Sequence, residues 1–215
     1  MPRYLTDSQR IAAAVKQAIL AGQLKPSQRL PQRKLAIQHG TTTIVVREAL
    51  RLLEHEGLVA IEPKWGAIVA EVNQEAIRGR YIVREALEGM AARLASQAFS
   101  DADRNELGDL ADRCDRELHM DGTPPAEKAK LHYALHAKIV RITACEELIA
   151  LIEKINLQMI IVHNAYHIDW TQERKGWHRR LVDAILSGDM ELAEKTMREH
   201  VRRGYEMEHK ALQNG

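Results

Sequence analysis

The sequence predicts a mainly α-helical protein with two parts: a small N-terminal unit of helices and a hairpin, then a larger unit made only of helices. Apolar residues recur at helical intervals over most of the 215 residues. Only 58–61 and 67–72 read as short strands. The two parts also differ in net charge. Residues 1–73 hold 10 Lys/Arg and 6 Asp/Glu, a net charge of +4, whereas residues 74–215 hold 21 Lys/Arg and 24 Asp/Glu, a net charge of −3. A basic unit joined to an acidic one favours a nucleic-acid partner for the first.

Two helices open the chain. The first ends near Gly22, before a turn through Pro26, and its apolar face is formed by Ile11, Val15, Ala18 and Ile19. A short second helix follows Pro31, carries Leu35 inward and stops at Gly40.

The third helix carries the strongest functional signal. Its apolar face repeats at i, i+3, i+4 and i+7, through Val46, Ala49, Leu50 and Leu53. The other side begins with Thr42 and Thr43 and carries Arg47 and Arg51 one turn apart. A small polar N-terminus with basic residues facing outward suits entry into a DNA major groove. The alternative is a structural helix of another bundle, with both arginines as solvated charges.

The hairpin completes the N-terminal unit. Residues 62–66 between the two strands have the composition of a turn, with Lys64 and Gly66 at its tip. Three helices and a hairpin make a winged helix-turn-helix. We therefore expect residues 1–73 to form a DNA-binding domain and residues 74–215 to form a separate α-helical domain.

The second part reads as six helices, at about 74–99, 102–119, 125–143, 146–168, 171–187 and 189–211. Ser100 is the expected cap of the second helix, Pro124 precedes the third, and Gly188 separates the last two. Cys114 and Cys145 lack CxxC spacing and are expected to be free thiols. Neither a signal peptide nor an apolar run of membrane-spanning length is found, so we expect a cytoplasmic, nucleoid-associated protein without a membrane partner.

Histidines carry the chemistry of this half. His132 and His136 lie one turn apart on one helix face, and the last two helices bring His178 and His200 side by side if they form an antiparallel hairpin. Four imidazole nitrogens facing one cavity would suit zinc or nickel rather than magnesium or calcium. A second pair, His163 and His167, has the same spacing and competes for this role.

The N-terminal residues resemble a known family. "AILAGQLKPSQRL", "VREALRLLEHEGLV" and "GAIV" are similar to the DNA-binding domain of GntR-family bacterial regulators. The resemblance implies that Thr42, Thr43, Arg47 and Gly66 contact DNA. The family commonly has S-R-T-P before V-R-E-A-L, whereas this chain has T-T-I-V. Thr43 stands where the family's Arg commonly reads a guanine, which implies a different operator sequence.

The C-terminal part resembles the FCD effector domain of the FadR-like GntR branch, through "VREALEGMAARLAS" and "WHRRLVDAILSGDMELAEKTMREH". Metal-binding FCD domains use one Asp and three His. His136, His178 and His200 take the His positions and His132 the Asp position. The family's effectors are mostly small carboxylates. Arg84 matches an arginine near that pocket, with a surface ion pair as its alternative role, and we expect Asn164 to line the pocket.

Together these features predict a ligand-responsive transcriptional regulator, a repressor or less often an activator, and not an enzyme. Its expected partners are double-stranded operator DNA, a second copy of the chain and a small carboxylate effector. Two alternatives remain open: a regulator that senses the metal itself, and a metal-dependent hydrolase. The hydrolase is disfavoured because the chain has no H-E-x-x-H motif and no acid between His132 and His136.

Overall fold

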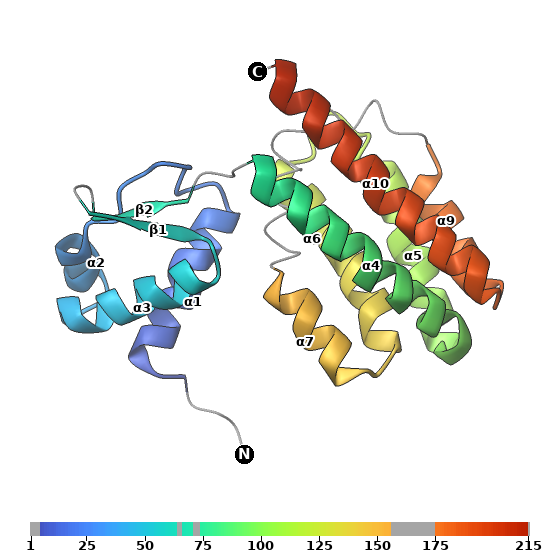
Figure 1. The fold of residues 1–215 in the computed structure, drawn as a ribbon, viewed down its shortest axis with the longest axis horizontal. Helices are drawn as coiled ribbons and strands as arrows, with labels where there is room; N and C mark the ends of the chain where they lie inside the picture. The colour runs from blue at the N-terminus through green and yellow to red at the C-terminus, as the bar shows by residue number, and fades with distance from the viewer. Residues whose placement is uncertain (1–4, 64–65, 71–73, 156–174, 215) are drawn as a thin grey trace. The chain divides into compact units, whose positions relative to one another are not determined.

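The computed structural model describes residues 5–63, 66–70, 74–155 and 175–214, and the chain divides into two compact units, Met1–Asn73 and Gln74–Gly215. Each unit is mainly helical (Figure 1), so the predicted fold class is confirmed. Within the described residues, no helix is both long enough and apolar enough to cross a membrane.

The first unit is a winged helix-turn-helix. Its elements in chain order are α1 (Asp7–Leu20), α2 (Gln32–Gln38), α3 (Thr43–His55), β1 (Val59–Glu62) and β2 (Gly66–Val69). The side chain of Thr6 accepts from the backbone N–H of Gln9, and the Gln9 side chain accepts in return from the backbone of Thr6, so a capping box starts α1. Both α1 and α2 pack against α3.

The core of this unit is the apolar face of α3. Val46, Ala49, Leu50 and Leu53 are all fully buried, as the periodicity predicts. The strands pair antiparallel, with Val59 opposite Val69 and Glu62 opposite Gly66. The segment before α2 joins this sheet, since the N–H of Leu30 donates to the carbonyl of Ala67. Helix α3 is therefore packed on one side against α1, α2 and the sheet, which leaves its other face exposed.

In the second unit the structure describes α4 (Gln74–Ala98), α5 (Asp101–Glu117), α6 (Pro125–Ile142), α7 (Glu146–Lys154), α9 (Trp177–Leu186) and α10 (Met190–Asn214). The two longest, α4 and α10, lie side by side (Figure 1), and α5 packs against α6 and α9. Leu107, Leu135, Ile139, Leu181 and Ile185 are among its fully buried side chains. This core holds the inward faces of α5, α6 and α9 at fixed positions.

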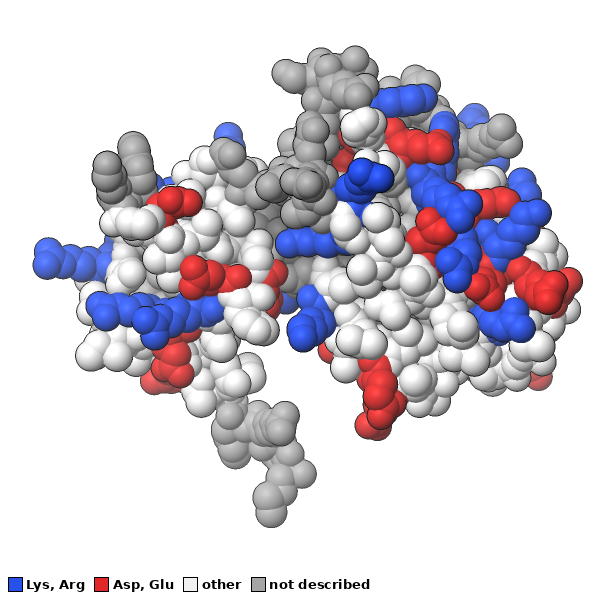
Figure 2. Space-filling view, viewed as in Figure 1, with Lys and Arg blue, Asp and Glu red and all other residues white. Residues whose placement is uncertain are grey.

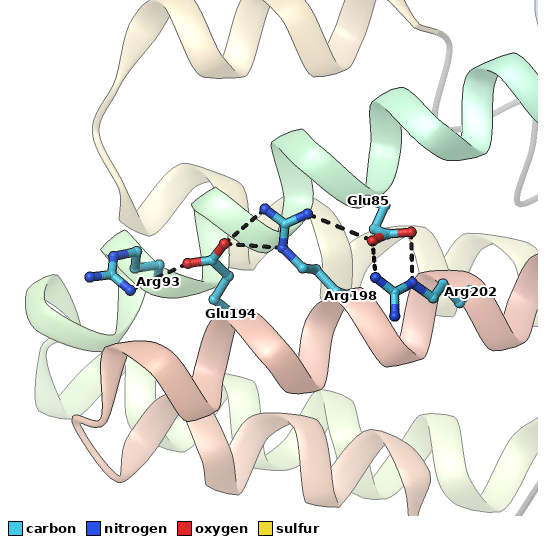
Figure 3. A network of polar contacts seen from close by, with 5 residues as sticks. All are labelled: Glu85, Arg93, Glu194, Arg198 and Arg202. Carbon is cyan, nitrogen blue, oxygen red and sulfur yellow. Dashed lines mark hydrogen bonds and ion pairs between the residues drawn. The ribbon is translucent and has the colours of Figure 1, made fainter.

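Charged side chains join α4 to α10 on the surface. Blue and red residues are interspersed over the visible face of this unit (Figure 2). Arg198 reaches Glu194 at 2.8 Å and Glu85 at 3.6 Å, and the network continues through Arg93 and Arg202 (Figure 3). A Cβ at Gly89 would lie 2.9 Å from Cγ of Arg198, so the absence of a side chain there lets Arg198 cross α4.

Two predicted helix boundaries are wrong. The helix expected at 171–187 is not continuous, because Gly176 has φ of +76°, a left-handed conformation that an α-helix excludes. Helix α9 begins at Trp177, and residues 171–174 lie outside the described residues. The segment expected at 146–168 ends as α7 at Lys154, with Ile155 as its cap, and 156–168 lie outside the described residues. Apolar residues continue past Lys154, so periodicity alone did not mark this end.

Candidate functional site

The predicted DNA-contact residues lie on the outer side of the first unit. Thr42 caps α3, its hydroxyl accepting from the backbone N–H of Val45 at 3.4 Å. Arg47 and Arg51 are exposed, and Thr43 is half-buried. Gly66 is exposed at the start of β2 with φ of +74°, which favours glycine. Lys64 lies outside the described residues.

The four predicted histidine ligands are buried in the second unit. His132 and His136 project from α6, His178 from α9 and His200 from α10. Their exposed fractions are 5%, 0%, 0% and 4%. Because α6, α9 and α10 meet here with α4, residues far apart in sequence come together. Burial lowers the pKa of His132 and of His200 well below the ordinary value, so these rings are neutral at physiological pH.

Three of these rings converge through their Nε2 atoms. His136 Nε2 lies 3.0 Å from His132 Nε2 and 3.2 Å from His200 Nε2, and the latter two are 3.3 Å apart. Within the described residues, His132, His136 and His200 form one group of potential metal ligands, whose ligating atoms all lie within 4.8 Å of one another. His178 is not part of that group, although its ring centroid lies 5.0 Å from that of His132 and 5.1 Å from that of His200.

Carboxylates fix the tautomers of two histidines. Nδ1 of His136 contacts Oε2 of Glu88 on α4, and Nδ1 of His178 lies 2.8 Å from Oδ1 of Asp115 on α5. An ionised carboxylate only accepts, so both Nδ1 atoms must donate. In the neutral imidazole this leaves a bare lone pair on Nε2, which is the form that binds a metal. The Nε2 of His178 is buried and has no hydrogen-bond partner among the described residues.

Glu88 is ionised despite its complete burial. Burial alone would raise its pKa, but the nearby Arg84 guanidinium and His136 overcome this and lower the pKa to about 2. Arg84 is itself only 3% exposed, donates from Nε to Glu88 at 2.6 Å and stacks on the ring of Tyr81 at 4.8 Å. The structure therefore places Arg84 in a buried ion pair, one turn from the residue that orients His136.

The histidine geometry fits a metal ion better than a hydrogen-bonded cluster. Each Nε2 is either a donor or an acceptor, so among three mutually close atoms at least one pair must be of the same kind. A cation facing three lone pairs removes this conflict. With metal–nitrogen distances of about 2.0–2.1 Å, two nitrogens on one ion lie about 3.0 Å apart at an octahedral angle and about 3.4 Å at a tetrahedral one. The observed 3.0–3.3 Å spacing falls within this range.

Sequence reasoning did not assign Glu88 and Asp115 a role at this site. Glu88 carries a weak signal, because an acid one turn after Arg84 stands among small apolar residues on the buried face of α4. For Asp115 the sequence gives no such signal, because its partner His178 is 63 residues away. The predicted pocket residue Asn164 and the competing pair His163 and His167 lie outside the described residues.

Comparison with known proteins agrees with both halves of the chain. Residues 7–69 match the family described as bacterial regulatory proteins, gntR family, and residues 80–203 match the FCD domain. The HTH-type transcriptional regulator YdhC of Bacillus subtilis is 25% identical over 209 residues, covering 94% of this chain and 90% of YdhC. A regulator from an unstable DNA locus of Streptomyces ambofaciens is 28% identical over 210 residues, covering 92% and 83%.

Solved structures share the fold. McbR/YncC of Escherichia coli superposes with a TM-score of 0.77 at 21% identity, over 96% of this chain and 99% of its own. The matched family consists of transcriptional regulators, not of enzymes, which confirms that prediction. With a GntR winged helix-turn-helix followed by an FCD domain, this chain belongs to the GntR family of transcriptional regulators, in its FadR-like branch.

Proposed function

We propose that this GntR regulator is a ligand-responsive repressor whose helical unit binds a small carboxylate metabolite at a histidine-ligated divalent metal. It acts in the cytoplasm as a homodimer on double-stranded operator DNA. The observation that carries the metal-anchored part is the convergence of three buried Nε2 atoms from α6 and α10, 3.0–3.3 Å apart. A cluster of neutral buried imidazoles has no structural advantage over apolar packing, which supports a role in binding.

The DNA-contacting surface is the exposed side of α3 with the wing. Arg47 and Arg51 lie one turn apart and are exposed, and Thr42 and Thr43 are at the helix N-terminus. Residues at this end of a recognition helix contact base edges, while flanking basic residues contact phosphates. In a homodimer two such helices enter successive major grooves, so the operator is near-palindromic.

The metal is a nitrogen-preferring transition ion, zinc or nickel. His132, His136 and His200 supply the three converging nitrogens, and His178 is the fourth proposed ligand. Glu88 and Asp115 orient two of these rings from behind. When bound, the ion would supply a Lewis acid to which an anionic effector could bind. No carboxylate lies among the four proposed ligands, so the positive charge there favours an anionic effector.

Arg84 supplies the second contact for that effector. Its Nε–H is held by Glu88, and its terminal nitrogens are the groups that would donate to a carboxylate. An effector bound to both would favour one arrangement of the dimer over another. The change in operator affinity is limited by how differently the effector binds the two arrangements.

The DNA-binding half of this proposal is tested with Arg47→Ala. Operators are selected from random duplexes by the wild-type protein, and affinities are measured at one fixed salt concentration. We expect Arg47→Ala to lose operator binding while its circular dichroism is unchanged. Arg113→Ala, which removes an exposed arginine from α5, is the matched control and should bind normally. Equal operator affinity of the wild type and Arg47→Ala would contradict the assignment.

The metal half is tested by elemental mass spectrometry on protein purified without a His-tag or chelator. We expect about one zinc or nickel ion per chain, lost in His136→Ala and retained in His55→Ala, whose histidine is exposed on α3. Absence of metal after dialysis against both ions would contradict the site. A screen of small carboxylates for release of the operator, with and without metal, then identifies the effector class.

A metal-sensing regulator is the second candidate, because all four proposed ligands are histidines. In that case zinc or nickel alone would change operator affinity reversibly, without any carboxylate. A metal that stays bound through purification and acts only together with a carboxylate would support the cofactor role instead.

A further inference from the structure

An isoleucine stands exposed at the N-terminus of the recognition helix. Ile44 is the second residue of α3, and 73% of its surface is exposed. Arg47 and Glu48 follow it by one turn on the same exposed face. Val46, Ala49 and Leu50 on the opposite face are fully buried. The packing that fixes α3 therefore directs Ile44 away from the core of its own unit.

The helix N-terminus fixes the backbone that carries Ile44. Thr42 caps the helix just before it, accepting from the N–H of Val45. A β-branched side chain in a helix has one strongly preferred χ1 rotamer, so its methyl groups have little freedom to lose on binding. Ile44 thus presents a pre-ordered apolar surface beside the predicted base-reading residues.

The location of Ile44 at the N-terminus of α3 distinguishes it from other exposed apolar residues. Single exposed apolar residues are common, and Ile37 on α2 is exposed even more, at 83%. However, the first residues of a recognition helix contact base edges in the major groove. The apolar group offered there is the C5-methyl of thymine, which isoleucine contacts without a hydrogen bond. Cytosine and uracil lack that methyl group.

We propose that Ile44 is a specificity-determining residue that contacts the C5-methyl group of a thymine in each operator half-site. The proposal rests on the proposed DNA-binding function of α3 and adds the chemistry of one base pair to it. The neighbouring Thr43 is half-buried and short, so it leaves room for the isoleucine to approach the base. The operator therefore has an A·T pair facing Ile44.

The test uses the full-length protein and deoxyuridine. An operator is first selected from random duplexes, and each thymine is then replaced in turn by deoxyuridine, which removes only the methyl group. We expect one thymine per half-site at which wild-type affinity falls about fourfold, the value for one buried methyl group. Replacement in both half-sites should multiply the loss to about sixteenfold.

Variants assign the effect to one side chain. Ile44→Ala should bind the thymine operator as weakly as the wild type binds the deoxyuridine operator, and should not distinguish the two. Ile44→Val should keep most of the discrimination. Ile37→Ala removes an isoleucine of equal size from α2 and should keep the full deoxyuridine penalty.

The possible negative results distinguish failure of the Ile44 proposal from failure of the DNA-binding function. A selected operator with no methyl-sensitive thymine overturns the proposal for Ile44 and leaves the DNA-binding function intact. An Ile44→Ala protein that still discriminates by fourfold also overturns it, as does loss of discrimination in Ile37→Ala instead. If no sequence is selected at all, both the DNA-binding function and this inference fail.

Discussion

Replacing Glu88 by glutamine tests how the histidine cluster is organised. Glutamine has nearly the shape of glutamate but carries no charge and offers an N–H₂ group to His136. If the amide donates, Nδ1 of His136 becomes the acceptor and its Nε2 carries the hydrogen, so it can no longer bind a metal. Loss of such an outer carboxylate typically lowers metal affinity about 10- to 100-fold. The corresponding loss of metal-dependent stabilisation is about 1.4–2.7 kcal/mol at saturating metal.

The same change also affects stability without metal. Arg84 is 3% exposed, and Glu88 is its ion-pair partner at 2.6 Å. Breaking a buried pair by removing one partner costs about 3–5 kcal/mol. The double variant Arg84→Met/Glu88→Gln removes the unpaired charge and should recover much of this loss. It separates the effect on folding from the effect on metal binding.

The assay is a zinc titration of metal-free protein against a chelator of known affinity, with thermal unfolding measured in parallel. Asp115→Asn is the matched carboxylate change behind His178, and it weakens zinc binding only if His178 is a ligand. If Glu88→Gln binds zinc as tightly as the wild type while His136→Ala does not bind, the argument about the tautomer is refuted. If neither variant differs from the wild type, the cluster is not a metal site.

Three further predictions concern stability. Burial raises the pKa of Glu208 to about 7, so the folded protein holds this proton more tightly than the unfolded chain and loses stability as pH rises from about 4.5 to 7. Glu208→Gln should therefore be more stable than the wild type at pH 8, by about 3 kcal/mol, and similar to it near pH 4.5, in thermal unfolding across pH. Thr42→Ala removes the cap of α3 and should cost about 1 kcal/mol by denaturant unfolding, whereas Thr42→Ser should cost little. Leu50→Ala, at a fully buried position of the same helix, should cost about 2–5 kcal/mol in the same measurement, and a loss below 1 kcal/mol would contradict the assigned core.

Much of the fold was predictable because its signals are local. The caps at Thr42 and Ser100 and the breaks at Gly40 and Gly188 depend only on a few neighbouring residues, and each lies at the expected boundary. The buried face of α3 also follows from spacing alone. The predicted start of α9 was wrong because residues 171–176 are polar and give no periodic signal, while the left-handed conformation of Gly176 sets the start at Trp177.

By itself, the sequence determined the two-part organisation, the helix that carries the exposed Arg47 and Arg51, and the four histidines that lie together in the second unit. It did so because helical periodicity and capping are short-range, and because the spacing of His132 and His136 fixes a shared face. Only the tertiary structure decided that His132, His136 and His200 converge while His178 stands slightly apart, and that Arg84 is buried against Glu88. These outcomes depend on the packing of α4, α6, α9 and α10, where helix offsets of a few ångströms decide which side chains meet. The packing of the whole core sets these offsets, so they cannot be inferred from the spacing of residues within any one helix.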